Sequence, residues 1–126
     1  MQAYLKVTID ESMRLITLRL KGAEASAVYT ELLLSAYDGI DKPWLYNRLL
    51  DYRQFSGLLD YSDVERLAQN WAERVAGQVY TAKVAILTFD ALTPVRAAGF
   101  AHLFPNNTVR SFDELHTALN WLNAPV

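Results

Sequence analysis

The stretch from Asn47 to Ala68, NRLLDYRQFSGLLDYSDVERLA, decides the fold of this chain. Its first part reads as a buried strand, predicted over residues 45–52, that ends in Asp and Arg. A loop around Gly57 follows, and the last part has the apolar spacing of an amphipathic helix. Strand, loop and helix in this order form the unit of an open α/β sheet, whose sites usually lie at the carboxyl ends of the strands. We therefore expect functional side chains in the loop after this strand.

The composition indicates one small α/β domain over residues 1–126. Hydrophobic residues make up 52% of the chain and charged residues 21%, which supplies enough apolar material for a core. The net charge of −2 and a pI of about 5.6 argue against nucleic acid as a partner. There is no cysteine, no signal peptide is visible, and no apolar run is long enough for a membrane span. We expect a soluble, cytoplasmic protein.

Hydrophobic periodicity extends the prediction to the whole chain. Two alternating runs near the N-terminus predict a β-hairpin, and the almost entirely apolar run over 83–89 predicts a strand that is covered on both faces and pairs in parallel. The predicted order is ββαβαβαβα, with strands at 4–9, 14–21, 45–52, 83–89 and 107–110 and helices at 24–37, 62–77, 93–103 and 112–122. This order predicts a mixed sheet, mostly parallel in its middle and packed by helices.

Local signals predict where three of the helices begin. Ser62 and Glu65 have the spacing of a capping box, and Ser111 and Glu114 repeat it before the last helix. Thr93 is predicted to cap the helix that follows, because Pro94 suits the first helical position. In the last helix we expect a buried stripe of residues Phe112, Leu115, Leu119 and Leu122.

The element order, the segment LLDYRQFSGLLDYSDVERLA and the C-terminal segment VRSFDELHTALNWL resemble the SpoIIAA-like branch of the STAS superfamily. The resemblance covers nearly the whole chain and implies a SpoIIAA-like mixed sheet with an N-terminal hairpin. Anti-sigma-factor antagonists of this superfamily are regulated by phosphorylation of a Ser in an Asp-Ser-Ser-Gly-Leu-like turn. The nearest match here, Phe55-Ser56-Gly57-Leu58, has one Ser and lacks the Asp. The sequence does not decide whether Ser56 or Ser62 is phosphorylated.

The candidate site is the loop after the third strand together with the adjacent helix N-termini. The loop combines aromatic and apolar side chains with a cation, which suits a protein partner or an apolar ligand. Folding of these side chains into the core is the alternative. For Arg53, an ion pair with Asp51, Asp60 or Asp90 is favoured over an anion site. The predicted partner- or ligand-binding residues are Arg53, Phe55, Ser56, Gly57, Tyr61, Ser62, Asp90, Thr93 and Arg96.

No residue pattern points to catalysis or to a bound metal. The acidic candidates Asp51, Asp60, Asp63 and Asp90 have structural explanations as turn formers or first-turn helix acids. His102 and His116 lie in different helices without a cluster of metal ligands. We expect neither an enzyme nor a metal site nor a cofactor.

Two functions remain. The leading hypothesis is a regulatory binding module that acts through protein–protein interaction, with an unknown protein or a second copy in a homodimer as its partner. The alternative is a carrier or sensor of a small apolar ligand, similar to Sec14-like modules. A carrier would need an internal cavity of roughly 300 Å³ or more.

Overall fold

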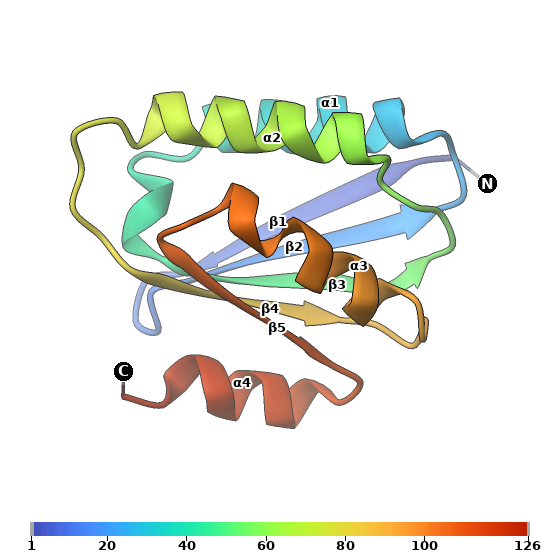
Figure 1. Cartoon of the computed structure of the whole chain (residues 1–126). Helices are drawn as coiled ribbons and strands as arrows, with labels where there is room; N and C mark the ends of the chain where they lie inside the picture. The colour runs from blue at the N-terminus through green and yellow to red at the C-terminus, as the bar shows by residue number, and fades with distance from the viewer. Residues whose placement is uncertain (1, 126) are drawn as a thin grey trace.

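A computed structural model describes residues 2–125 of the chain. Five strands and four α-helices follow one another in the predicted order, with two short 3-10 turns between them (Figure 1). The elements are β1 (Tyr4–Asp10), β2 (Leu15–Gly22), α1 (Ser26–Asp38), η1 (Pro43–Leu45), β3 (Asn47–Phe55), α2 (Tyr61–Arg74), β4 (Ala82–Leu87), α3 (Thr93–Phe100), η2 (Ala101–Leu103), β5 (Asn107–Phe112) and α4 (Leu115–Asn123).

The strands form a single mixed sheet in the order β1-β2-β3-β4-β5. β1 and β2 pair antiparallel as the predicted hairpin, and each later strand pairs in parallel with the strand before it. The prediction that the third and fourth strands run side by side in the same direction is confirmed, with Arg48 opposite Val84 and Asp51 opposite Leu87. β4 has a strand on each side, which explains why its sequence is apolar throughout.

Helices cover the two faces of the sheet unequally. α4 lies alone on one face, whereas α1, α2 and α3 lie on the other (Figure 1). Under α4, a core cluster joins alternate residues of three strands to the helix: Leu15, Leu49, Ala85, Leu87, Ala118 and Leu122. Side chains alternate between faces along a strand, so the neighbours of these strand residues point toward the three-helix side. That side holds the candidate site.

The predicted capping boxes are wrong, and tertiary contacts explain why. α2 begins at Tyr61 with Asp60 as its N-cap, and Ser62 lies inside the first turn. The Asp60 backbone N–H donates instead to the hydroxyl of Ser26 (2.8 Å), which itself donates to the carboxylate of Asp63. The Ser26 side chain, at the start of α1, thus makes the hydrogen bonds that hold the first turn of α2.

The caps predicted for the two later helices are also wrong. β5 pairs with β4 as far as Phe112, so Ser111 is held in the sheet and cannot cap α4, which begins at Leu115. Leu115, expected in the buried stripe, is 39% exposed. Thr93 is the first residue of α3 rather than its cap. The carboxylate of Asp90 forms this turn, accepting from the Leu92 backbone N–H (3.0 Å) and from the Thr93 hydroxyl (3.2 Å).

Candidate functional site

A cavity of about 150 Å³ lies between the sheet and the three helices on its more heavily covered face. Most of its wall is apolar. The apolar and aromatic lining residues are Leu33, Tyr37, Leu50, Tyr52, Phe55, Leu58, Leu59, Val64, Leu67, Trp71, Val84, Ile86, Ala97, Phe100, Ala101, Phe104 and Val109. Leu58 lines the cavity and is also 42% exposed, so the cavity reaches the surface at the loop between β3 and α2.

The central strand supplies the floor of the cavity. Arg48, Leu50 and Tyr52 alternate along β3 and line it, and the alternation spreads them over about 13 Å. Beyond Tyr52 the register shifts, since Arg19 lies opposite Asp51 but Lys21 lies opposite Gln54. This β-bulge places one extra residue in β3 and turns the next side chains over.

Because of the bulge, Phe55 lies on the cavity side of the sheet. Its ring packs edge-on against Tyr29 (4.6 Å between centroids) and against Tyr52 (5.5 Å). Without the extra residue, Phe55 would share the face of Asp51. The expected aromatic loop residue is therefore part of the cavity wall rather than an outward-facing contact.

One charged side chain is deeply buried in this wall. Arg48 is only 5% exposed and donates from Nη1 to the hydroxyl of Tyr37 (2.9 Å) and from Nη2 to Oδ1 of Asn107 (2.8 Å). The guanidinium also lies over the ring of Trp71, 4.1 Å from its centroid. Within residues 2–125, its buried Nε has no hydrogen-bond partner.

Tyr52 adds a second polar group. Burial raises the pKa of its phenol, as does the nearby phenol of Tyr37, while the positive charge of Arg48 acts in the opposite direction. The net increase keeps Tyr52 protonated, so its hydroxyl remains a hydrogen-bond donor. A donor beside a cation suits a ligand that carries an acceptor or a negative charge.

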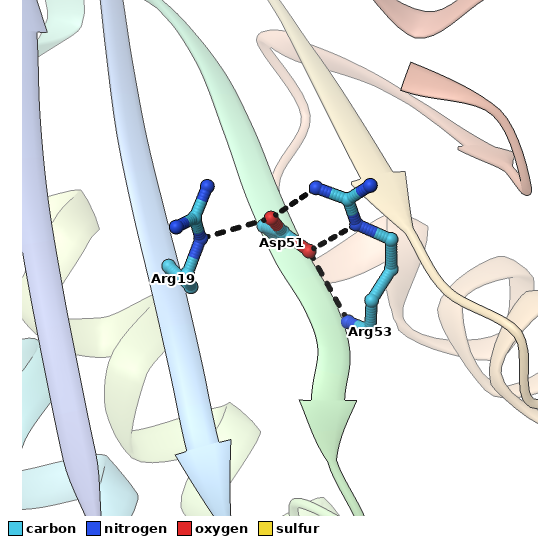
Figure 2. Close-up of polar contacts among 3 residues, drawn as sticks. All are labelled: Arg19, Asp51 and Arg53. Carbon is cyan, nitrogen blue, oxygen red and sulfur yellow. Dashed lines mark hydrogen bonds and ion pairs between the residues drawn. The ribbon is translucent and has the colours of Figure 1, made fainter.

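The other face of the sheet carries a separate charged cluster. Asp51 accepts hydrogen bonds from Arg19 (3.1 Å) and from both Nε and Nη2 of Arg53 (3.0 and 2.9 Å), as Figure 2 shows. The Arg53 backbone N–H also donates to Asp51 (3.2 Å). Burial alone would raise the pKa of the Asp51 carboxyl, but the Arg53 hydrogen bonds and the Arg19 contact hold it below its usual range.

The nine predicted site residues thus fall into separate groups. Phe55, Gly57, Thr93 and Arg96 line the cavity. Arg53 forms the ion pair that the sequence favoured, with Asp51 as its partner, on the opposite face from Phe55. Ser56, Tyr61, Ser62 and Asp90 are exposed around the loop and the start of α3.

Sequence reasoning missed the residues at the deep end of the cavity. Arg48, Tyr37, Asn107 and Trp71 come from four different elements and meet there. One signal was available: Arg48 directly precedes Leu49 and Leu50 in a strand predicted to be buried, where a charge requires a specific partner.

The described residues contain no group of three or more acidic or histidine side chains that could hold a metal ion. Of the acidic candidates, Asp51 is bound to two arginines and Asp90 shapes the turn before α3. None of the four expected carboxylates lines the cavity. Within residues 2–125, no helix combines the length and apolar character needed to cross a bilayer.

The order of the elements, the mixed sheet and its N-terminal hairpin define an α/β protein with a SpoIIAA-like fold. Among solved structures, this chain is similar to an uncharacterized protein of the DUF3478 family with a SpoIIAA-like fold, from Shewanella loihica PV-4. The two are 22% identical, the likeness covers 97% of this chain and 96% of that one, and the TM-score is 0.61. No family model and no curated protein matches this chain.

Proposed function

We propose that this chain is a binding module that takes a small apolar ligand into the cavity between the sheet and helices α1, α2 and α3, without catalysing a reaction on it. The cavity carries the proposal, because a concave, mostly apolar space with a few converging polar groups is the usual form of a ligand site. Its volume of about 150 Å³ falls short of the roughly 300 Å³ that we expected for a carrier, so the proposed ligand must be smaller than a drug-sized molecule. A cavity of this size suits a single aromatic ring or a short alkyl chain.

Filling the cavity tests this function. Ala97 lies on the face of α3 that lines the cavity, whereas its neighbour Ala98 is exposed. The probe is 1-hexanol, and the measurement is the melting temperature as the probe concentration rises. The native chain should gain stability with the probe, by about 2.7 kcal/mol at 100 times the dissociation constant. Ala97→Leu should lose most of this gain.

Ala98→Leu is the matched control, because it adds the same side chain on the solvent side of the same helix. It should respond to 1-hexanol as the native chain does. Equal responses from both variants, or no response from the native chain, would contradict the proposed site. Native mass spectrometry of the purified chain gives an independent check by detecting a ligand that co-purifies with it.

A second candidate is the regulatory protein interaction expected from the sequence, with which the SpoIIAA-like fold is consistent. Phe89, Leu92 and Val95 favour it, since these apolar side chains are 71%, 57% and 71% exposed and follow one another closely in the sequence, from the end of β4 into the first turn of α3. We call these three residues the α3 surface. Exposed apolar groups that cluster in this way are typical of contact sites. A cytoplasmic location remains a prediction.

A further inference from the structure

The charged side chains that line the cavity are all positive. Arg48 lies at its deep end and Arg96, in the first turns of α3, lies half-buried nearer the surface. No Asp or Glu is among the described residues that line the cavity. The whole chain, in contrast, has a net charge of −2. The cavity is therefore a positive interior in an acidic protein.

Arg48 has hydrogen-bonding capacity that the protein does not use. A guanidinium has five N–H donors, and two of them have acceptors in the described part of the chain, at Tyr37 and Asn107. The buried Nε of Arg48 has no acceptor among the described residues. No carboxylate within residues 2–125 forms an ion pair with Arg48. The Trp71 ring stabilises the cation but does not neutralise it.

A buried charge without a counterion costs several kcal/mol of folding stability. An apolar side chain at position 48 would fill the same place in β3 without that cost. The arrangement is thus unfavourable for folding alone and becomes favourable once an anion enters the cavity.

We propose that the ligand is a small monocarboxylate with an apolar body, and that Arg48 binds its carboxylate. The inference rests on the proposed function and adds the charge of the ligand. A carboxylate matches the paired donors of a guanidinium. A phosphate monoester would bring nearly two negative charges to one deeply buried cation, which makes it the poorer match. The apolar body would lie along Leu50, Ile86 and Phe100 toward the opening at Leu58.

Two probes that differ only in charge test the proposal: hexanoate and 1-hexanol. Calorimetric titration should show hexanoate binding to the native chain at least tenfold more tightly than 1-hexanol. In Arg48→Met, which keeps an unbranched apolar stem but lacks the guanidinium, this preference should disappear while 1-hexanol still binds. Arg66→Met, which removes an exposed cation from α2, should keep the preference.

The native chain alone provides a second measurement, which remains valid if Arg48→Met does not fold. The ¹H–¹⁵N signal of the Arg48 Nε–H group should shift on addition of hexanoate and stay almost unchanged with 1-hexanol. Three results would overturn the inference: equal affinity for the two probes, an unmoved Nε–H signal, or a preference that is lost in Arg96→Met and kept in Arg48→Met. Equal affinity would leave the proposed function intact, whereas the absence of binding by either probe would reject both.

Discussion

At the scale of single residues, the two buried charges of β3 are handled in opposite ways. Asp51 is 3% exposed, and its carboxylate is fully engaged by Arg19 and Arg53. Arg48 is buried to the same degree, and its described contacts are all with neutral groups. In the first arrangement the buried charge is neutralised by partners within the protein, so a structural role accounts for it. The second has unused donors, and Arg48 lies on the face of the sheet that lines the cavity.

The Asp51 cluster predicts a specific dependence of stability on pH. The folded pKa of Asp51 is lowered from 3.8, so its contribution to stability is fully present above about pH 4 and is lost as the pH falls through the folded value. Asp51→Asn should lower the free energy of unfolding at pH 7 by about 2 kcal/mol, because it removes charged hydrogen bonds from a buried group. Urea unfolding between pH 7 and pH 3 measures the change.

The difference between native chain and Asp51→Asn should therefore shrink as the pH approaches 3. Asp41→Asn is the control, since Asp41 is exposed and forms no ion pair with any of the described residues. It should leave the pH profile unchanged. A constant difference between native chain and Asp51→Asn across this range would show that the carboxylate charge is not what stabilises the cluster.

At the scale of elements, β3 shows which features of a strand can be predicted from the sequence and which cannot. Its sequence indicated a buried strand, and the order of the neighbouring segments placed it beside β4 in parallel. The predicted end at residue 52 is three residues short, because the bulge continues the pairing to Phe55 opposite Gly22. A bulge depends on the partner strand, so no periodicity within β3 alone could show it. The same holds for the caps, where Ser26 from another helix replaced the expected local contact.

Gly22, where β2 ends, supports a prediction at this scale. Its φ of +105° is unfavourable for other residues, and a Cβ there would lie 2.8 Å from the carbonyl oxygen of Gln2 and 2.8 Å from the hydroxyl of Tyr29. Both crowding and backbone strain therefore oppose a side chain. Gly22→Ala should lower the free energy of unfolding by about 3 kcal/mol, as measured by urea unfolding at pH 7.

Gly77→Ala is the matched comparison. Gly77 also has a positive φ, +79°, but a Cβ there would have no neighbour within 4 Å. This variant should lose about 1 kcal/mol, which is the cost of backbone strain without crowding. Equal losses at the two positions would mean that the close approach to Gln2 and Tyr29 contributes nothing.

At the scale of the whole molecule, the unequal coverage of the sheet determines where a ligand can enter. α4 closes its face with a continuous apolar cluster, whereas three helices on the other face leave a space that none of them fills. The sequence placed Phe55, Gly57, Thr93 and Arg96 near a common site, since each follows or begins an element at the carboxyl edge. It could not reveal the cavity itself. A cavity forms where the side chains of several packed elements do not fill the space between them, and here Tyr37, Trp71 and Asn107 line it from segments far apart in the chain.

The α3 surface supports the last prediction, which concerns association between molecules. Phe89, Leu92 and Val95 are exposed together, so pairing two copies through this surface would remove apolar area from water. Sedimentation velocity over a dilution series should show the native chain forming dimers at high concentration. The double variant Phe89→Ser with Val95→Ser should raise the dissociation constant of the dimer at least tenfold.

Val79→Ser provides the control for this experiment, because Val79 is fully exposed between α2 and β4, away from the α3 surface. It should leave the association unchanged, since an isolated apolar side chain adds little contact area. If Val79→Ser weakened the dimer as much as the double variant, association would reflect general hydrophobicity rather than this surface. A native chain that stays monomeric at every concentration would exclude a second copy as the occupant. The α3 surface would then be left either to a different protein or to the entry of the ligand, whose opening at Leu58 lies at the same end of the strands.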